Sequence, residues 1–242
     1  MTFRKIVVEN LAELAARAAS EIMLEMSRKP DLSLLAATGN TPMGCYAELA
    51  ARHTARTLDT TKLRVVQLDE YLGVNDDDPR SLYRWLETSL TAPLEISQDR
   101  LVRFSGNAEH AERDCREVAT RIAAWGGIDL SVLGLGPNGH LGFNEPPSAP
   151  DAPTRALNLT PASLASNAPY WAGLTVPQRA VTVGMSEILK SRRVLLLVSG
   201  EHKREILRRT LREPPTASVP ASWLQNANLT VIADRAAWGD EA

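Results

Sequence analysis

The chain has 242 residues, enough for one large α/β domain or two small ones, and we interpret residues 1–242 as a single domain. Hydrophobic residues make up 44% and charged residues 23% of it, which is ordinary for a soluble globular protein. The net charge of −2 gives no reason to expect general binding to nucleic acid or to an anionic membrane. The two cysteines, Cys45 and Cys115, cannot make a disulfide framework and fit a reducing compartment.

The amino-terminal residues do not have the pattern of a secretion signal. Glu9 and Glu13 interrupt the apolar residues there, so the long apolar core of a signal peptide is missing. No uninterrupted apolar stretch in the sequence is long enough to span a bilayer. We therefore expect a cytoplasmic protein with neither a membrane partner nor a nucleic-acid partner.

The first half of the chain alternates between predicted strands and predicted helices. Asn10 stands directly before apolar residues that recur at helical spacing, which predicts a helix N-cap at that position. The polar, turn-rich residues 72–80 separate a strand from a helix. The predicted strands are residues 3–8, 32–37, 63–68 and 101–104, and the predicted helices are residues 11–29, 43–53, 81–90 and 109–125.

The second half continues the alternation after one irregular segment. Residues 146–178 hold many Pro, Ala, Asn and Ser, which predicts a lid or a substrate-facing excursion. The predicted strands are residues 128–135, 180–184, 194–198 and 229–233, the last of them closing the chain, with helices at 185–190 and 201–211. Strands alternating with helices predict a three-layer α/β fold, in which helices cover both faces of a mostly parallel sheet.

The stretch from residue 128 to residue 148 is the densest in functional groups. Its apolar strand runs into GLGPNGHLGFNEPPS, a loop with three glycines that let the backbone approach a ligand closely. Ligands of α/β proteins bind beyond the carboxyl ends of the strands. The glycines match G-x-G-x-x-G, but a dinucleotide site also needs a helix at the third glycine, and HLGFNEPP is no helix start. The pattern therefore disfavours a nucleotide.

Two strand ends offer acid and base groups. His140 is a typical proton shuttle near neutral pH, and a carboxylate such as Glu145 can fix its tautomer and support its charged form. The alternative is a surface histidine beside an unrelated glutamate. Asp69 and Glu70 end another predicted strand, where one of them could be a general base or both could be solvated turn residues. Spacing alone leaves these alternatives open.

A second loop suggests an anion site. Thr38, Gly39, Asn40 and Thr41 lie between a strand and a helix that has Pro42 in its first turn, where free backbone N–H groups favour a phosphate. The alternative is a plain N-cap by Asn40 or Thr41. Lys203 is predicted in a first helical turn, where a cation opposes the helix dipole unless it faces an anion, and the alternative is a solvated lysine.

The remaining histidines give no further site. His53, His110 and His202 show no ligand spacing with one another or with the cysteines, so we expect no metal.

Together these motifs are similar to those of the glucosamine-6-phosphate deaminase and 6-phosphogluconolactonase superfamily. The resemblance covers nearly the whole chain, with ATGNTP, LDEYLG, VLGLGPNGHLGFNEP, TVG and SGEHK in the same order. LDEY and GHLGFNEP resemble the deaminase/isomerase branch. The glycine-rich run together with VSGEHK and SVPASWLQ is most similar to the galactosamine-6-phosphate isomerase/deaminase subgroup.

The resemblance implies an enzyme that turns galactosamine-6-phosphate or glucosamine-6-phosphate into a ketose 6-phosphate and ammonia. It implies a small sugar phosphate as partner, no cofactor, and an oligomeric state that is left open, a homo-oligomer included. Asp69 would move a proton between C2 and C1, His140 would open the pyranose ring, and Glu145 would orient His140. Residues 38–41 would hold the phosphate, and Lys203 would add positive charge.

Three departures from the superfamily pattern matter. Asn138 stands where glucosamine-6-phosphate deaminases typically have Asp, although the galactosamine-type proteins that this chain resembles also have Asn. The family's phosphate-binding Arg has no clear counterpart near residues 168–170, and Arg179 could substitute for it. Of the basic pair that forms an allosteric phosphate site in some deaminases, Arg155 is present but Leu157 replaces the second cation, so we expect no such activation.

Two other functions remain as alternatives. A sugar-phosphate lactonase would need His140 but not Asp69. A non-catalytic sugar-phosphate sensor is the other alternative, because the effector domains of some transcription regulators resemble this fold. Those regulators carry an amino-terminal helix-turn-helix domain, whereas the predicted sheet here already begins at Phe3.

Overall fold

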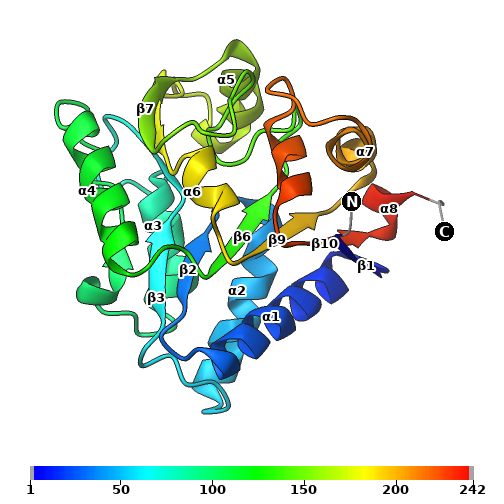
Figure 1. Cartoon of the computed structure of the whole chain (residues 1–242). Helices are drawn as coiled ribbons and strands as arrows, with labels where there is room; N and C mark the ends of the chain where they lie inside the picture. Colours follow the sequence, from blue (N-terminus) through cyan, green and yellow to red (C-terminus); the bar gives the residue numbers. More distant parts are fainter. Residues whose placement is uncertain (1–2, 240–242) are drawn as a thin grey trace.

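A parallel sheet forms the centre of the computed structural model, which describes residues 3–239 (Figure 1). Each neighbouring pair of its strands runs parallel. Within the described residues the sheet has seven strands, in the order β1 (Arg4–Val8), β10 (Leu229–Asp234), β9 (Arg193–Val198), β6 (Leu130–Gly134), β2 (Ser33–Ala36), β3 (Arg64–Gln67) and β5 (Leu101–Val102).

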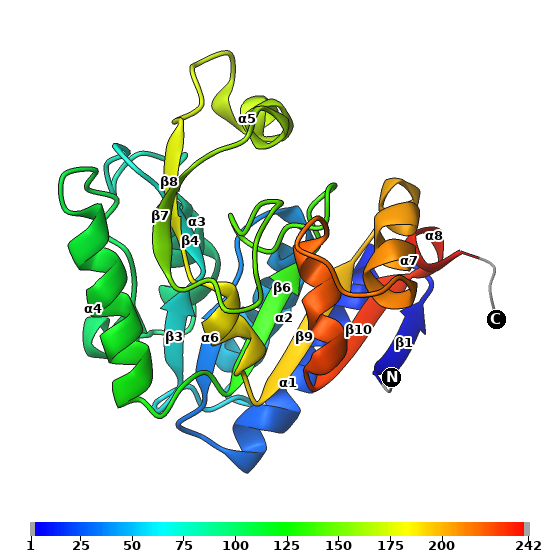
Figure 2. The same ribbon diagram turned by 45° about the horizontal axis from the view of Figure 1, so that its top comes forward.

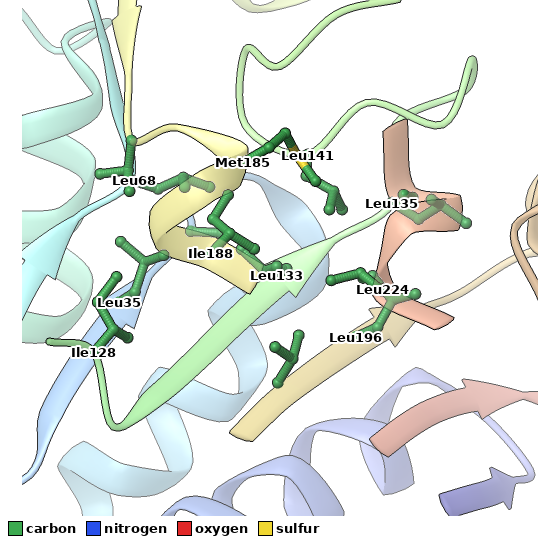
Figure 3. Close-up of a cluster of buried hydrophobic side chains, with 14 of the residues drawn as sticks. Leu35, Leu68, Ile128, Leu133, Leu135, Leu141, Met185, Ile188, Leu196 and Leu224 are labelled. Carbon is green, nitrogen blue, oxygen red and sulfur yellow. The ribbon is translucent and has the colours of Figure 1, made fainter. Parts of the chain in front are cut away.

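Helices cover both faces of this sheet and complete the three layers. One apolar core joins the sheet to α1 (Leu11–Arg28), α2 (Asn40–Thr54) and α3 (Leu82–Leu86), which continues into a π-helical turn at Glu87–Thr91. The other core joins it to α4 (Ala111–Ala124), α6 (Met185–Leu189), α7 (Arg204–Arg212) and a 3₁₀ segment at Pro220–Asn226. Figure 3 shows this second core, with Leu133 and Leu196 of the sheet beneath Ile188 and Leu224. The predicted fold class is confirmed.

Helix α1 shows why the sequence pattern is informative. The side chain of Asn10 accepts a hydrogen bond from the backbone N–H of Glu13 at 3.0 Å, as an N-cap does. The helix buries Leu14, Ile22 and Met26 from one stripe against the sheet. The predicted cap and the predicted helix are both confirmed.

A second, smaller sheet stands above the carboxyl ends of the parallel strands (Figure 2). It is antiparallel, with β4 (Asp69–Tyr71) paired to β8 (Arg179–Thr182), and β8 paired to β7 (Arg155–Asn158). The predicted strand at residues 180–184 therefore exists, as β8, but it lies in this antiparallel sheet and not in the central one. The reason is that β3 ends at Gln67 and, after Leu68, the chain continues into β4, whose partner lies about a hundred residues further along the chain.

Residues 146–178 are also more regular than predicted. They contain β7, helix α5 (Pro161–Asn167) and a 3₁₀ turn at Ala168–Trp171. We call residues 155–178 the lid segment. It packs through a small apolar cluster in which the ring of Tyr71 lies 5.2 Å from that of Phe143 and 5.3 Å from that of Trp171. The sequence did not indicate these elements because they are short. Strand β7 also has no buried residue, so it lacks the apolar pattern that predicts a strand.

The end of the chain differs from the prediction in one element. Helix α8 (Arg235–Trp238) follows β10, so that strand is not the last element. Asp234 makes this short helix possible, because its carboxylate accepts a hydrogen bond from the backbone N–H of Ala237 at 2.8 Å. Further 3₁₀ turns lie at Gln98–Arg100 and Glu201–Lys203. Among the described residues, no helix is both long and apolar enough to cross a membrane.

Candidate active site

The candidate site lies where the order of the strands reverses. From β2 the chain adds β3 and β5 on one side, whereas β6, β9 and β10 lie on the other. The loops that leave β2 and β6 therefore diverge, and a crevice opens between them, as expected at such a point of an α/β sheet. The structure has a cavity of about 460 Å³ there, lined from both loops, from β4, from residues 79–85 and from the lid segment.

The two adjacent carboxylates after β3 have different environments. Glu70 is buried and accepts hydrogen bonds from the backbone N–H groups of Tyr71, Leu82 and Tyr83 at 2.7–3.0 Å. The hydroxyl of Ser81 also donates to it, at 2.9 Å. Glu70 thus anchors the start of α3 and does not line the cavity. Of the two carboxylates, only Asp69 lines the cavity, so it remains the candidate base, and that role stays a prediction.

Asp69 lines the cavity and is only 7% exposed. Burial, with a smaller contribution from the negative charge of Glu70, raises the pKa of Asp69 to about 8. A carboxylate with so high a pKa is a strong base for its class when it is ionised, because the protein around it stabilises the charge poorly. That property suits a group that must remove a proton from carbon.

We expect the pH profile of kcat/KM to reflect this carboxylate. A general base works in its ionised form, so kcat/KM should rise as the pH increases and should level off above about 8, where Asp69 has lost its proton. The measurement is kcat/KM for the sugar phosphate from pH 5 to pH 9.5. A profile that is flat from pH 6 upward would contradict the raised pKa of this group.

The glycines after β6 make room for His140. A Cβ atom at Gly136 would lie 2.2 Å from Cδ2 of His140, so the imidazole packs against a backbone that only glycine can provide. Gly139 has φ +84°, which lets the loop turn back towards the cavity. No helix begins at Gly139, so the G-x-G-x-x-G pattern positions a histidine here and does not form a dinucleotide site.

His140 lines the cavity and faces Glu145, which lies outside the cavity lining. Nδ1 of His140 lies 3.9 Å from Oε1 of Glu145, both atoms are buried, and neither has a hydrogen-bond partner among the described residues. Asn138 connects the two residues: its amide donates to Oε2 of Glu145 at 3.1 Å, and its carbonyl oxygen accepts from the backbone N–H of His140 at 3.2 Å. The structure thus brings Asn138, His140 and Glu145 together. That Glu145 orients His140 stays a prediction.

The environment keeps His140 neutral. Burial and the nearby charge of Lys203 lower the pKa of His140 to about 4. The pKa of Glu145 is raised because it is buried, although the donors from Asn138 and Thr160 oppose that rise. The neutral imidazole can therefore accept a proton from a substrate and return it. A bound phosphate dianion would offset the charge of Lys203 and make the imidazolium easier to form.

The loop after β2 is suited to an anion. Helix α2 begins at Asn40, its N-cap is Gly39 with φ +106°, and no side chain caps it. The predicted alternative, a plain N-cap by Asn40 or Thr41, is therefore wrong. Residues 38–41 all line the cavity, so uncapped N–H groups and the positive end of the helix dipole are directed to it.

Lys203 brings a cation to the same cavity. It lies in the 3₁₀ turn Glu201–Lys203 that leads into α7, and its Nζ donates to the carbonyl oxygen of Leu135 at 2.7 Å. Burial lowers the pKa of Lys203, and no carboxylate among residues 3–239 is paired with it to offset its desolvation. Lys203 is therefore a partly buried cation at the cavity and not a fully solvated lysine.

Arg179 is the predicted phosphate ligand that the structure does not bring to the cavity. It opens β8, its side chain is exposed, and it is not among the residues that line the cavity. The sequence placed Arg179 at the start of a strand but did not show where the start of that strand lies relative to the cavity. In the antiparallel sheet the register pairs Arg179 with Asn158 at the far end of β7.

Sequence reasoning missed Arg80 in the cavity wall, whereas it did predict a lid or substrate-facing excursion within residues 146–178, and residues of the lid segment line the cavity. The guanidinium of Arg80 lies 4.8 Å from the ring centre of Trp171 and is paired with Asp78, with Nε donating to Oδ1 at 2.8 Å. Tyr170 accepts a hydrogen bond from the amide of Asn40 at 3.2 Å, at the start of α2. All of these except Asp78 line the cavity. An arginine in a polar turn gave no signal that it would face a site.

Arg155 has a structural role in this protein. Its guanidinium donates to the side-chain oxygen of Asn144 at 2.8 Å and to the hydroxyl of Ser148 at 3.0 Å. It therefore fastens β7 to the loop that follows His140, and both of its donor groups face protein acceptors. This geometry is in keeping with the expectation that Arg155 does not form an allosteric phosphate site, an expectation that stays a prediction.

Residues 3–239 contain no group of His, Cys, Asp and Glu side chains arranged to hold a metal ion.

Known proteins resemble the whole chain. Residues 7–233 match the family model described as glucosamine-6-phosphate isomerases/6-phosphogluconolactonase. A glucosamine-6-phosphate deaminase of Geobacillus sp. is 38% identical over 232 residues, which is 95% of this chain and 92% of that protein. The corresponding deaminase of Clostridium botulinum is 35% identical over 236 residues, 97% of each chain.

Solved structures agree with these sequence matches. A monomeric glucosamine-6-phosphate deaminase superposes with a TM-score of 0.92 at 33% identity and covers 97% of this chain and 98% of its own. The 6-phosphogluconolactonase of Trypanosoma cruzi has a TM-score of 0.82 at 21% identity, covering 100% and 97%, a likeness that concerns the fold alone. The chain therefore belongs to the family of glucosamine-6-phosphate isomerases and 6-phosphogluconolactonases.

Proposed function

We propose that this protein is an aldose–ketose isomerase and deaminase that converts an amino-sugar 6-phosphate into a ketose 6-phosphate and ammonia. One observation supports this most strongly. The buried carboxylate of Asp69, with its pKa raised to about 8, lines the same cavity as His140. Lys203 and the uncapped start of α2 line that cavity too, so a phosphate can anchor a sugar between the acid and base groups.

The reaction follows from these positions. Phosphate binding at residues 38–41 and Lys203 uses remote binding energy to orient C1 and C2 of the sugar. His140 takes the proton from the O1 hydroxyl and returns a proton to O5, which opens the ring to the aldehyde. Asp69 then removes the C2 proton, which the aldehyde makes acidic, and gives an enolamine. Protonation at C1 by Asp69 yields an imine at C2, and water hydrolyses it to the ketose and ammonia.

Asp69 distinguishes this proposal from the lactonase alternative. Hydrolysis of a sugar-phosphate lactone needs a base for water, a task that His140 could perform alone. Lactone hydrolysis gives no reason to bury the carboxylate of Asp69 so deeply that its pKa rises to about 8. The high pKa costs stability, and proton abstraction from carbon is a task that uses it.

The sugar itself is proposed as glucosamine-6-phosphate or galactosamine-6-phosphate. The relatives at 35–38% identity are glucosamine-6-phosphate deaminases, while the glycine-rich run and SVPASWLQ resemble the galactosamine subgroup. The two sugars differ in the orientation of one hydroxyl.

A panel of amino-sugar 6-phosphates, scored for ammonia release beside a lactone-hydrolysis assay, tests the proposal. Ammonia release from one or both sugars is the expected result. Lactone hydrolysis without ammonia release would establish the hydrolase instead, and tight sugar-phosphate binding without either activity would establish a sensor.

Lys203→Gln should weaken binding of the phosphate. We expect KM for the amino-sugar phosphate to rise about tenfold to a hundredfold, the usual cost of losing a hydrogen bond to a charged group, with a smaller change in kcat. Inhibition by inorganic phosphate should weaken in parallel. Lys190→Gln is the matched control, because Lys190 is exposed after α6 and remote from the cavity lining. An unchanged KM in Lys203→Gln would exclude Lys203 from phosphate binding.

A further inference from the structure

We infer that Thr160 is a positioning residue of the active site, holding one oxygen of Glu145 from the N-cap of helix α5 so that the other oxygen is left for His140. The inference rests on the proposed function, because it gives the His140–Glu145 pair its task. Thr160 lies in the lid segment, fifteen residues beyond Glu145 in the sequence. It does not line the cavity and does not reach the substrate position itself.

The hydroxyl of Thr160 makes two directed contacts. Oγ1 donates to Oε2 of Glu145 at 3.0 Å and accepts from the backbone N–H of Ser163 at 3.2 Å, which caps α5. A hydroxyl has one proton to donate, so the cap fixes the side chain as an acceptor towards the helix and directs its proton to the carboxylate. The start of α5 and the carboxylate of Glu145 are thereby joined through a single atom.

The two oxygens of Glu145 are not used alike. Oε2 accepts from both Thr160 and the amide of Asn138, at 3.0 Å and 3.1 Å. Oε1 is buried without a partner, and it faces the equally unpartnered Nδ1 of His140 at 3.9 Å. Two donors on one oxygen stop the carboxylate from rotating. The free oxygen is therefore directed at the imidazole, and the short remaining gap can close when substrate binds.

The charged groups around this pair give Thr160 a specific effect. Lys203 is the cation that acts on His140, and it disfavours the imidazolium. Glu145 is the opposing carboxylate, and it supports the imidazolium only when it is ionised. Each hydrogen bond to Oε2 stabilises the ionised form, which lowers the pKa of Glu145 against the effect of its burial. Without Thr160 the carboxylate should therefore be neutral to a higher pH.

The position of Thr160 also links Glu145 to the rest of the lid segment. Helix α5 leads directly into the 3₁₀ turn that carries Tyr170 and Trp171. Tyr170 contacts Asn40 at the start of α2, and Trp171 packs edge-on against Tyr71, two residues after Asp69. The lid segment therefore contacts the start of α2 through Tyr170, packs near Asp69 through Trp171, and holds Glu145 through Thr160.

The test uses the full chain and the variants Thr160→Val and Thr160→Ser. The first readout needs no activity: the tautomer of His140 in the ligand-free protein, from nitrogen chemical shifts of labelled histidine at pH 7. The unpartnered carboxylate oxygen should favour a proton on Nδ1. Thr160→Val should move the proton to Nε2, and Thr160→Ser should keep it on Nδ1. Thr160→Ala replaces Thr160→Val if the valine variant does not fold.

The second readout is kinetic. In Thr160→Val we expect kcat to fall about tenfold, the cost of one hydrogen bond to a charged group. The steeper part of the acid limb, which lies below the step that Asp69 sets near pH 8 and where Glu145 also gains a proton, should begin at higher pH. Thr160→Ser should restore both. Leu164→Ala is the matched control in α5. Leu164 packs against the apolar cluster that contains Tyr71 and Trp171, and it makes no hydrogen bond to Glu145. It should raise KM without moving the tautomer or the acid limb.

The outcomes separate this inference from the proposed function. An unchanged His140 tautomer in Thr160→Val would overturn the positioning role, even if activity fell. A Leu164→Ala variant that shifted the tautomer as much as Thr160→Val would reduce Thr160 to a general support of the lid segment and would also overturn it. A tautomer shift in a protein that releases ammonia from no amino sugar would reject the proposed function and keep the contact between Thr160 and Glu145.

Discussion

Replacing Asp69 with asparagine should lower turnover roughly a thousandfold, within the range that a positioned general base contributes, and leave sugar-phosphate binding nearly unchanged. Asparagine has the same shape but cannot take a proton from C2, so the enolamine would not form. The phosphate contacts lie at residues 38–41 and Lys203, which the substitution does not touch. The measurement is ammonia release under saturating substrate, together with binding of the sugar phosphate by calorimetry.

The neighbouring carboxylate offers the control for this variant. Glu70→Gln changes charge by the same amount one residue away, but Glu70 accepts its hydrogen bonds from the start of α3 and does not line the cavity. We expect it to lower the melting temperature and to affect turnover far less than Asp69→Asn. Turnover of Asp69→Asn close to that of the unchanged protein would remove Asp69 from the mechanism.

Asp69→Asn should also make the protein more stable than the unchanged protein above neutral pH. The folded-state pKa of Asp69, about 8, lies above its unfolded value, so the folded protein binds this proton more tightly. The free energy of unfolding therefore falls as the pH rises from about 4 towards 8, where ionisation of the buried group must be accommodated. Asparagine does not ionise. The melting temperature of Asp69→Asn relative to the unchanged protein should increase between pH 5 and pH 8.

Much of this site could be predicted from local sequence because each feature has a local cause. The apolar strands before Thr38, Asp69 and Gly134 place three loops near the carboxyl edge of the sheet, whatever the helices between them do. The nearness of these three loops could therefore be predicted without knowing the order of the strands in the sheet. Asn10 likewise predicts a helix start from one side-chain hydrogen bond within its own turn.

The features that local sequence could not predict depend on contacts between distant segments. Strand β4 is three residues long and pairs only with β8, so nothing in its own residues indicates an antiparallel sheet. Arg80 faces the cavity only because Trp171, far along the chain, lies beneath its guanidinium. The contact of Thr160 with Glu145 likewise exists only once β7 and α5 fold above the loop.

The start of α2 shows how a small error in a boundary can change the interpretation of a site. The predicted helix began three residues after its true start at Asn40, and that made a side-chain cap plausible. With the helix starting at Asn40, Gly39 is the cap and offers no side chain. The free N–H groups then belong to the cavity wall, which favours an anion more strongly than the sequence did.

His140→Gln should produce the second large effect, and its size should depend on the form of the substrate. With the cyclic amino-sugar phosphate we expect turnover to fall about a hundredfold, at the low end of the contribution of a general acid–base group. The comparison substrate is a 4,5-dideoxy amino-sugar 6-phosphate, which has no hydroxyl at C4 or C5 and can close neither a furanose nor a pyranose ring. With it, His140→Gln should cost less than about fivefold, because Asp69 performs the proton transfers at carbon.

Glutamine is chosen because it keeps a polar side chain in the space that Gly136 leaves open, so the loop need not collapse. The ratio of the two losses is the decisive quantity, since any damage to folding or phosphate binding lowers both rates alike. An equal loss on both substrates would place the imidazole after ring opening, for example at hydrolysis of the imine. A selective loss on the ring form, combined with a neutral imidazole whose pKa is near 4, would mean that His140 begins as a base towards O1. It would then become an acid towards O5 only while Glu145 and the bound phosphate support its charge.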